Sequence, residues 1–115
     1  MSKKLKVHLI DILEAIERIE ALTKDVTFEE FKKDISAIHS VTEDFAIIGE
    51  AAKQIPAGNK SKFNLFPWKQ REGFRGKVVH DFDYTKVRVL WDAVKLDLPV
   101  LKSMIESFLD DFGNE

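Results

Sequence analysis

The sequence contains no cysteine among its 115 residues. This absence excludes disulfide-stapled scaffolds, thiolate metal sites and cysteine nucleophiles together. It also fits a reducing compartment, and we expect the chain to be cytoplasmic. A chain of this length buries enough apolar surface to fold without disulfides or structural metal. We therefore expect one helical domain over residues 1–115.

Long apolar runs are absent as well. No stretch approaches the roughly 18–20 apolar residues that are needed to span a bilayer. The first twenty residues begin with lysines followed by apolar residues, but Asp11, Glu14 and Glu17 interrupt the apolar stretch. They predict an amphipathic helix rather than a signal peptide, and we expect no membrane association.

The two-residue alternation that is typical of strands is also missing, and the apolar residues follow helical spacing instead. A first helix is predicted over residues 3–22, with a core-facing seam. Thr27 and Glu30 form a capping-box pattern that opens a second helix over residues 28–54. The two seams, at alternating steps of four and three, are Leu5, Leu9, Ile12, Ile16 and Ile19, and then Phe31, Ile35, Ile38, Thr42, Phe45, Gly49 and Ala52.

Three more helices are predicted in the second half of the chain. Pro67 opens the third, which ends near residues 80–82, and Asp83 caps the fourth. Asp97-Leu98-Pro99 predicts a break before the fifth, with Pro99 in its first turn. The short connections favour antiparallel neighbours. We therefore predict an all-α, up-and-down antiparallel bundle of four main helices plus a shorter one. The spare apolar surface of so small a bundle indicates a homodimer. The fourth helix is expected to turn Val87, Leu90, Trp91 and Val94 inward.

Charge is distributed unevenly along the chain. The net charge of −2 gives no overall attraction to nucleic acid. Residues 60–77, however, carry a single acid, Glu72, and could form a local anion-binding patch. The basic residues of this stretch are Lys60, Lys62, Lys69, Arg71, Arg75 and Lys77.

Within that stretch, Arg75 lies five residues before His80. A guanidinium holds phosphate through a planar fork of donors, and a histidine exchanges protons near neutral pH. Together they could cleave a phosphodiester without metal, provided that the fold brings them together. Positions five apart on a helix differ by about 140°. Convergence therefore requires the helix to end or bend near His80, or a second subunit to contribute its own pair.

A purely structural role is the alternative for the same residues. Arg75 would then be solvated or paired with Glu72, and His80 would cap the C-terminus of its helix. Asp81 and Asp83 flank His80, but two carboxylates beside one histidine make a poor metal site. No phosphate-binding glycine loop, catalytic triad or zinc motif is present, so we expect neither metal nor cofactor.

The segment from Arg75 to Phe82 resembles the Arg-x-x-x-x-His-x-Tyr signature of HepT-like proteins, in the HEPN superfamily of helical ribonucleases. Further segments resemble the same family in the same order, and the resemblance covers roughly residues 5–109. These segments are residues 47–53, Pro67-Trp68, residues 89–94 and residues 97–101.

This resemblance implies a helical homodimer whose two signature motifs meet in a cleft and cleave RNA without metal. Such proteins are toxins whose partner is an MNT-type nucleotidyltransferase, which in some systems transfers AMP to the signature tyrosine. On the matching positions, His80 would be the general acid/base and Arg75 would stabilise the phosphorane. The residues expected to bind the substrate are Arg71, Lys77 and Asp81.

Two positions depart from the family pattern. Gly76 replaces the polar residue, often asparagine, that usually follows the arginine. Phe82 replaces the signature tyrosine, so the usual acceptor of AMP is lost, and Tyr84 is the candidate substitute. These departures favour a second hypothesis, a non-catalytic subunit that binds the nucleotidyltransferase, with or without a nucleotide. A purely structural helical dimer is the third hypothesis.

Overall fold

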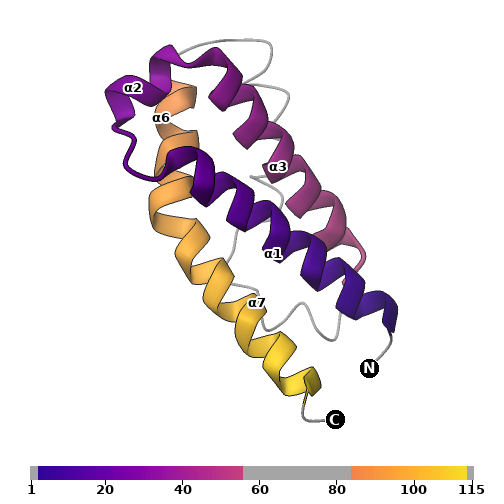
Figure 1. The fold of residues 1–115 in the computed structure, drawn as a ribbon. Coiled ribbons are helices and arrows are strands. Elements are labelled where there is room, and N and C mark those ends of the chain that lie inside the picture. The colour runs from indigo at the N-terminus through magenta and orange to yellow at the C-terminus, as the bar shows by residue number, and fades with distance from the viewer. Residues whose placement is uncertain (1–2, 56–83, 114–115) are drawn as a thin grey trace.

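The structure, a computed structural model, describes residues 3–55 and 84–113, which are mostly helical (Figure 1). No strand occurs within these two ranges, and the all-α prediction is confirmed. The elements, in chain order, are α1 (Lys3–Thr23), α2 (Phe28–Lys33), α3 (Ile35–Lys53), α6 (Tyr84–Asp92), the π-helix η2 (Ala93–Asp97) and α7 (Leu98–Gly113).

The helices form an antiparallel bundle (Figure 1). Helix α1 packs lengthwise against α3 on one side and against α7 on the other, and it runs opposite to both. The short α2 crosses one end of the bundle and contacts α3 and α6. Consequently α1 begins and α7 ends at the same end of the molecule.

Helix α1 has the predicted bounds to within one residue and the predicted seam. All five seam residues are buried, and Ala15 joins them. Each fully buried Leu or Ile side chain contributes on the order of 1.5–3 kcal/mol to folding. Burial along this seam therefore fixes α1 at the centre of the described part of the bundle, with α3 and α7 on its two sides.

The predicted second helix is two helices, and the single span over residues 28–54 is wrong. The chain leaves helical geometry at Asp34, whose φ of −102° and ψ of 89° end α2. The Asp34 carboxylate then caps α3 by accepting a hydrogen bond from the Ala37 N–H at 3.1 Å. The break shifts the helical phase, so Ile35, predicted to be buried, is 57% exposed.

The start of α2 follows the prediction closely. The Thr27 hydroxyl accepts a hydrogen bond from the Glu30 N–H at 3.1 Å, and the Glu30 carboxylate accepts one from the Thr27 N–H at 3.0 Å. The predicted capping box is therefore confirmed. Its reciprocal bonds satisfy two amide groups that have no partner inside the helix.

No break occurs at Asp97-Leu98-Pro99, where one was predicted. Leu98 keeps helical dihedral angles, and its N–H donates to the carbonyl of Ala93, five residues earlier. The wider π-turn accommodates Pro99, which has no N–H to continue the α-helical ladder. Pro99 does lie in the first turn of α7, as predicted, but α6, η2 and α7 form one continuous rod (Figure 1).

The rod is anchored by the four residues of α6 and η2 that were expected to face inward, and all four are buried. The Trp91 ring packs against Phe31 with centroids 5.1 Å apart and against Phe28 at 6.2 Å. Trp91 is therefore a core residue, as its helical position predicts, and it ties α6 to α2.

Candidate functional site

The residues predicted to carry the chemistry lie outside the described ranges. The predicted third helix lies there too. Tyr84 is the first residue of α6. The site residues that fall between the two described ranges are Arg71, Arg75, Lys77, His80, Asp81 and Phe82.

The helices on either side of this signature segment share one core. Ile55, just after α3, and Val87, in the first turns of α6, are both buried in the same apolar cluster as α1 and α7. The scaffold therefore holds Ile55, the last described residue before residues 56–83, and α6, the first described helix after them, in a fixed relation. Burial of Ile55 and Val87 is how the described fold fixes the two ends between which the site residues lie.

A groove between α1 and α3 is a feature of the described surface that could hold a ligand. It consists of two hollows that share Glu43, and we call it the α1–α3 groove. The first hollow has a volume of about 480 Å³ and is lined by His8, Asp11 and Ile47, among others. The second has about 600 Å³ and is lined by Arg18, Leu22 and others.

A partly buried ion pair joins the two helices that form the groove. The Arg18 Nε donates to Asp44 Oδ1 at 2.9 Å, and the Asp44 side chain is only 9% exposed. Sequence reasoning missed this pair. The signal was present, because Asp44 falls at helical spacing between Val41 and Ile48, where a carboxylate must find a partner.

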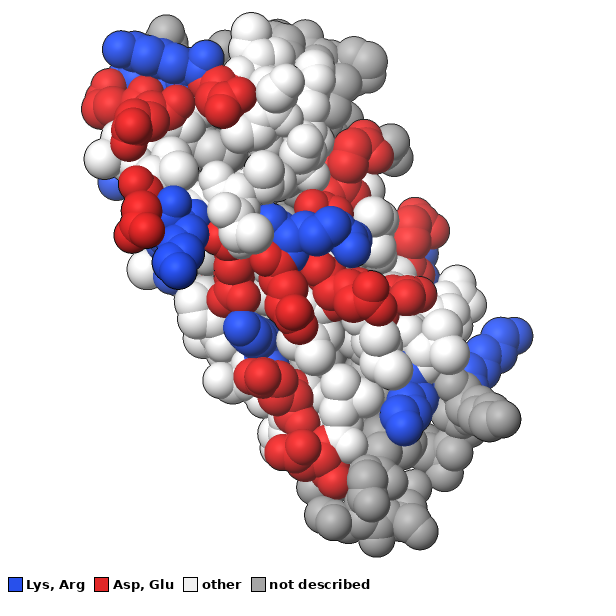
Figure 2. Space-filling view, in the orientation of Figure 1, with Lys and Arg blue, Asp and Glu red and all other residues white. Residues whose placement is uncertain are grey.

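The groove does not resemble a nucleic-acid site. Its lining contains four carboxylates, from Asp11, Glu43, Asp44 and Glu50, which oppose the approach of phosphates. Acidic side chains also gather over the middle of the face drawn in Figure 2. In the described residues, no three histidine or carboxylate side chains come together as a metal site. No helix of the described part is long and apolar enough to cross a membrane.

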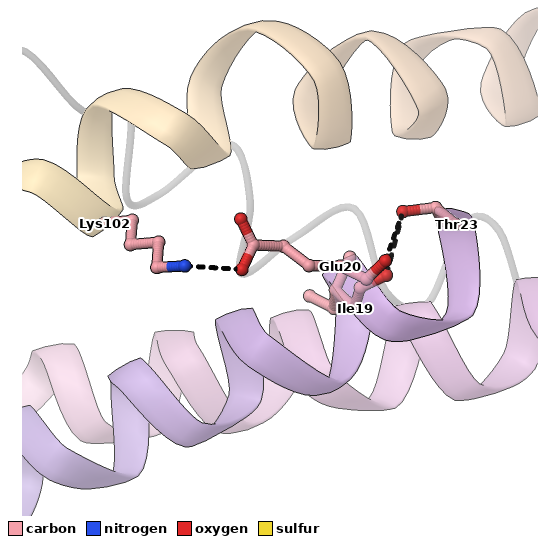
Figure 3. Close-up of polar contacts among 4 residues, drawn as sticks. All are labelled: Ile19, Glu20, Thr23 and Lys102. Atoms are coloured by element: carbon pink, nitrogen blue, oxygen red, sulfur yellow. Dashed lines mark hydrogen bonds and ion pairs between the residues drawn. The ribbon is translucent and has the colours of Figure 1, made fainter. Parts of the chain in front are cut away.

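A third hollow, of about 420 Å³, lies on the other side of α1, against η2. The Lys95 Nζ donates to the Thr23 carbonyl at 3.3 Å and lies 4.6 Å from the centre of the Trp91 ring. Lys102 pairs with Glu20 at 2.8 Å (Figure 3). These contacts fasten α7 and η2 to α1, so we assign this region a structural role.

The shifted pKa values of the described residues have structural causes. Hydrogen bonding to Glu20 raises the pKa of Lys102. The Thr27 backbone N–H lowers the pKa of the Glu30 carboxyl, and a hydrogen bond from Lys32 lowers that of Glu29. Each shift reflects an ion pair or a helix cap, and none identifies a group prepared for proton transfer.

Comparison with known proteins identifies the family. Residues 12–108 match the ribonuclease HepT-like family, and the match contains the whole segment from Arg75 to Phe82. This chain belongs to the HepT-like family. The resemblance drawn from the signature and its flanking segments is therefore confirmed.

The curated relatives cover nearly the whole chain. The probable ribonuclease HepT of Thermococcus cleftensis is 41% identical over 106 residues, which are 92% of this chain and 96% of that protein. A putative RNase of Methanocaldococcus jannaschii is 35% identical over 107 residues, or 92% of this chain and 98% of its own length. A second protein of that organism, named gamma-glutamylcyclotransferase and putative RNase, is 34% identical over 96% of this chain and 50% of itself. No solved structure matches the chain.

Proposed function

We propose that this protein is a metal-independent RNA endonuclease that acts, as a homodimer, as the toxin of a toxin–antitoxin pair. Its antitoxin would be an MNT-type nucleotidyltransferase. The observation that carries the proposal is the family match over residues 12–108, which contains Arg75 and His80 at the signature spacing. Two relatives that this chain matches over most of their length are named as ribonucleases, which supports RNA as the substrate class.

The proposed reaction uses the 2′-hydroxyl of the RNA as its nucleophile. His80 accepts the proton of that hydroxyl as the 2′-oxygen bonds to the adjacent phosphorus. The bond from phosphorus to the 5′-oxygen then breaks, and the leaving oxygen takes up a proton. The products carry a 2′,3′-cyclic phosphate and a 5′-hydroxyl, and DNA, which has no 2′-hydroxyl, is not cleaved.

The basic residues of the signature segment would supply the positive charge that this reaction needs. Arg75 stabilises the extra negative charge of the phosphorane through its fork of N–H donors. Arg71 and Lys77 would contact the neighbouring phosphates, and Asp81, which follows His80 in the sequence, would orient the substrate. This division of roles requires no metal ion.

Cleavage of a labelled RNA by the purified chain in the presence of EDTA tests the proposal. We expect wild type to cleave, and Arg75→Ala to cleave about 10²–10³-fold more slowly, as when a transition-state donor is removed. Arg88→Ala is the matched control, because Arg88 lies on α6 and pairs with Asp92 at 3.3 Å. Equal cleavage by wild type and Arg75→Ala would remove the assigned role.

A second function is favoured by Gly76 and Phe82, which depart from the signature. The chain would then be a non-catalytic subunit that binds the nucleotidyltransferase, with or without a nucleotide in its cleft. Titration of the chain into a nucleotidyltransferase encoded beside its gene, followed by calorimetry, tests this function. A tight complex together with no RNA cleavage by wild type supports it, and absence of heat argues against it.

AMP transfer gives a direct assay of the modified position. The chain contains a single tyrosine, Tyr84. Labelled AMP that the nucleotidyltransferase attaches to a tyrosine of wild type must therefore be on Tyr84, and Tyr84→Phe should abolish that labelling. If wild type is not labelled, Phe82→Tyr, which restores the signature tyrosine, is expected to gain the label.

A further inference from the structure

We propose that the α1–α3 groove is the docking site for a basic, amphipathic helix of a second, different protein. This site goes beyond the proposed function, because it lies on α1 and α3 and uses none of the signature residues. Its chemistry follows from the length of the groove, from the apolar side chains that the two hollows expose, and from the carboxylates that flank them.

The groove is long enough for about four turns of helix. Its lining runs from His8 to Leu22 on α1 and from His39 to Gln54 on α3. At a rise of 1.5 Å per residue, each side is therefore about 21–23 Å long. A helix of about 14–15 residues has this length, and helix-in-groove recognition uses a segment of this kind.

A large apolar side chain remains exposed in each hollow. Ile47 lines the first hollow and is 40% exposed, and Leu22 lines the second and is 39% exposed. The contact between Arg18 and Asp44 sets the register of the two antiparallel helices. Ile47 lies three residues after Asp44 and Leu22 four residues after Arg18, in opposite directions along the groove. Ile47 and Leu22 are therefore about 10–11 Å apart along it, which matches positions i and i+7 of a docked helix.

The charge of the lining selects a basic partner. Arg18 offsets one of the four carboxylates, so the lining carries a net charge of −3 with its histidines neutral. Glu50 also pairs with Lys53 at 3.2 Å, but the two side chains are 72% and 50% exposed, and such a pair contributes little. The same charge opposes RNA and a second copy of this groove, whereas it attracts the lysines and arginines of a basic helix.

The positions of the carboxylates specify where the basic residues of the partner lie. In the same register, Glu43 lies between Ile47 and Leu22, about 6 Å from Ile47, and Asp11 and Glu50 lie about 4–6 Å beyond Ile47. These rises correspond to three or four residues of helix. Counted from Ile47 toward Leu22, the partner therefore has apolar residues at i and i+7 and basic residues at i−4 and i+4. These four positions lie within about 80° of one another, on one face of a helix.

A synthetic peptide with this pattern tests the site on the full chain. The probe is a fluorescent helical peptide of about 16 residues, with Leu at i and i+7, Lys at i−4 and i+4, and Ala or Gln elsewhere. The control peptide has the same composition, with the two Leu and two Lys moved to different faces. By fluorescence anisotropy, we expect one-to-one binding of the probe, about tenfold or more tighter than binding of the control. Amide NMR shifts at Leu22 and Ile47 should locate it in the groove.

Two substitutions in the groove separate the charged and apolar contributions. Glu43→Lys sets a cation against a lysine of the peptide, and the dissociation constant should rise about tenfold or more. Glu106→Lys, the same charge change at an exposed position of α7, should leave it unchanged. Ile47→Ser removes an apolar contact without changing charge and should raise the dissociation constant about three- to tenfold. Circular dichroism confirms that each variant is folded.

The remaining outcomes assign the groove to another occupant or to none. Equal binding of the two peptides, equal binding by wild type and Glu43→Lys, or NMR shifts outside both hollows would overturn the inference. A labelled RNA that displaces the peptide would assign the groove to nucleic acid, and peptide binding that weakens as the chain is concentrated would assign it to a second copy. Both results also overturn the inference. RNA cleavage is scored separately, so a chain that binds the peptide but cleaves no RNA refutes only the proposed nuclease.

Discussion

The two sides of α1 differ in how completely the chain covers them. On the α7 side, Lys102 reaches Glu20 at 2.8 Å and Lys95 reaches the Thr23 carbonyl at 3.3 Å (Figure 3). On the α3 side, one partly buried ion pair joins the helices, but the two hollows and the exposed Val7 and Leu22 remain. Both sides belong to one amphipathic helix, and within the described residues the α3 side leaves more apolar surface exposed.

This difference separates contacts that fold the chain from contacts that are available for association. On the α7 side, the polar contacts between the helices are partly exposed, and each contributes little to the free energy of unfolding. On the α3 side, the contact between the helices includes the buried Asp44 carboxylate, and loss of its ion-pair partner would lower the free energy of unfolding. The same side leaves apolar side chains exposed. Substitutions on the two sides should therefore affect different properties.

The largest effect on stability is expected from Arg18→Ala on the α3 side. It leaves the Asp44 carboxylate buried without its ion-pair partner, and the free energy of unfolding should fall by about 1–3 kcal/mol. Urea denaturation at a fixed protein concentration measures the change. Asp44→Asn in the Arg18→Ala background should recover part of the loss. A decrease below about 0.5 kcal/mol would mean that the pair does not hold α1 to α3.

A smaller effect is expected from Lys102→Ala on the α7 side. The pair with Glu20 is partly exposed, so its loss should cost about 0.2–1 kcal/mol. The pKa of Lys102 is raised above its usual value of 10.5 by the hydrogen bond to Glu20. The contribution of this ion pair to the free energy of unfolding is therefore complete below pH 10.5. The difference between wild type and variant should persist from pH 7 to 9 and shrink only above pH 10.5. A difference that vanished at pH 8 would contradict this assignment.

The smallest effects on stability are expected from exposed apolar residues. Ile47→Ser in the groove and Leu96→Ser on η2 should each change the free energy of unfolding by less than about 0.5 kcal/mol, because both side chains are already exposed to water. Urea denaturation of each variant beside wild type measures the change. A loss above about 1 kcal/mol in either variant would mean that the side chain packs against the folded core.

Much of the fold could be predicted because local patterns determine it. The bounds and seam of α1 follow from periodicity, and the capping box at Thr27 follows from the Glu three residues later. Burial of Trp91 follows from its place in the α6 seam. Each of these features depends on residues within one or two helical turns, which a sequence displays directly.

The wrong predictions arise where two local signals compete. Asp34 is a strong N-cap residue inside a periodic pattern, and its cap with Ala37 prevailed over continuity of the helix. Pro99 indicated a break, but a single π-helical segment absorbed the missing N–H without a turn. The ion pair of Arg18 and Asp44 joins residues 26 positions apart, and only the packing of α1 on α3 reveals it.

The family was predictable from the sequence, whereas the geometry of the proposed site was not. The spacing of Arg75 and His80, with four flanking segments in order, was sufficient to indicate the family that the comparison then established. Convergence of the two side chains depends on the bend or the second subunit that brings them together, and a linear spacing does not specify either.

The most direct test of the proposed chemistry is the end-group analysis of RNA incubated with wild type and with His80→Ala in EDTA. Wild type should produce 2′,3′-cyclic phosphate ends, and His80→Ala should produce them about 10²–10⁴-fold more slowly, as expected for loss of a general acid/base. Undiminished cleavage by His80→Ala, or cleavage by wild type only after a divalent metal is added, would contradict the proposed mechanism.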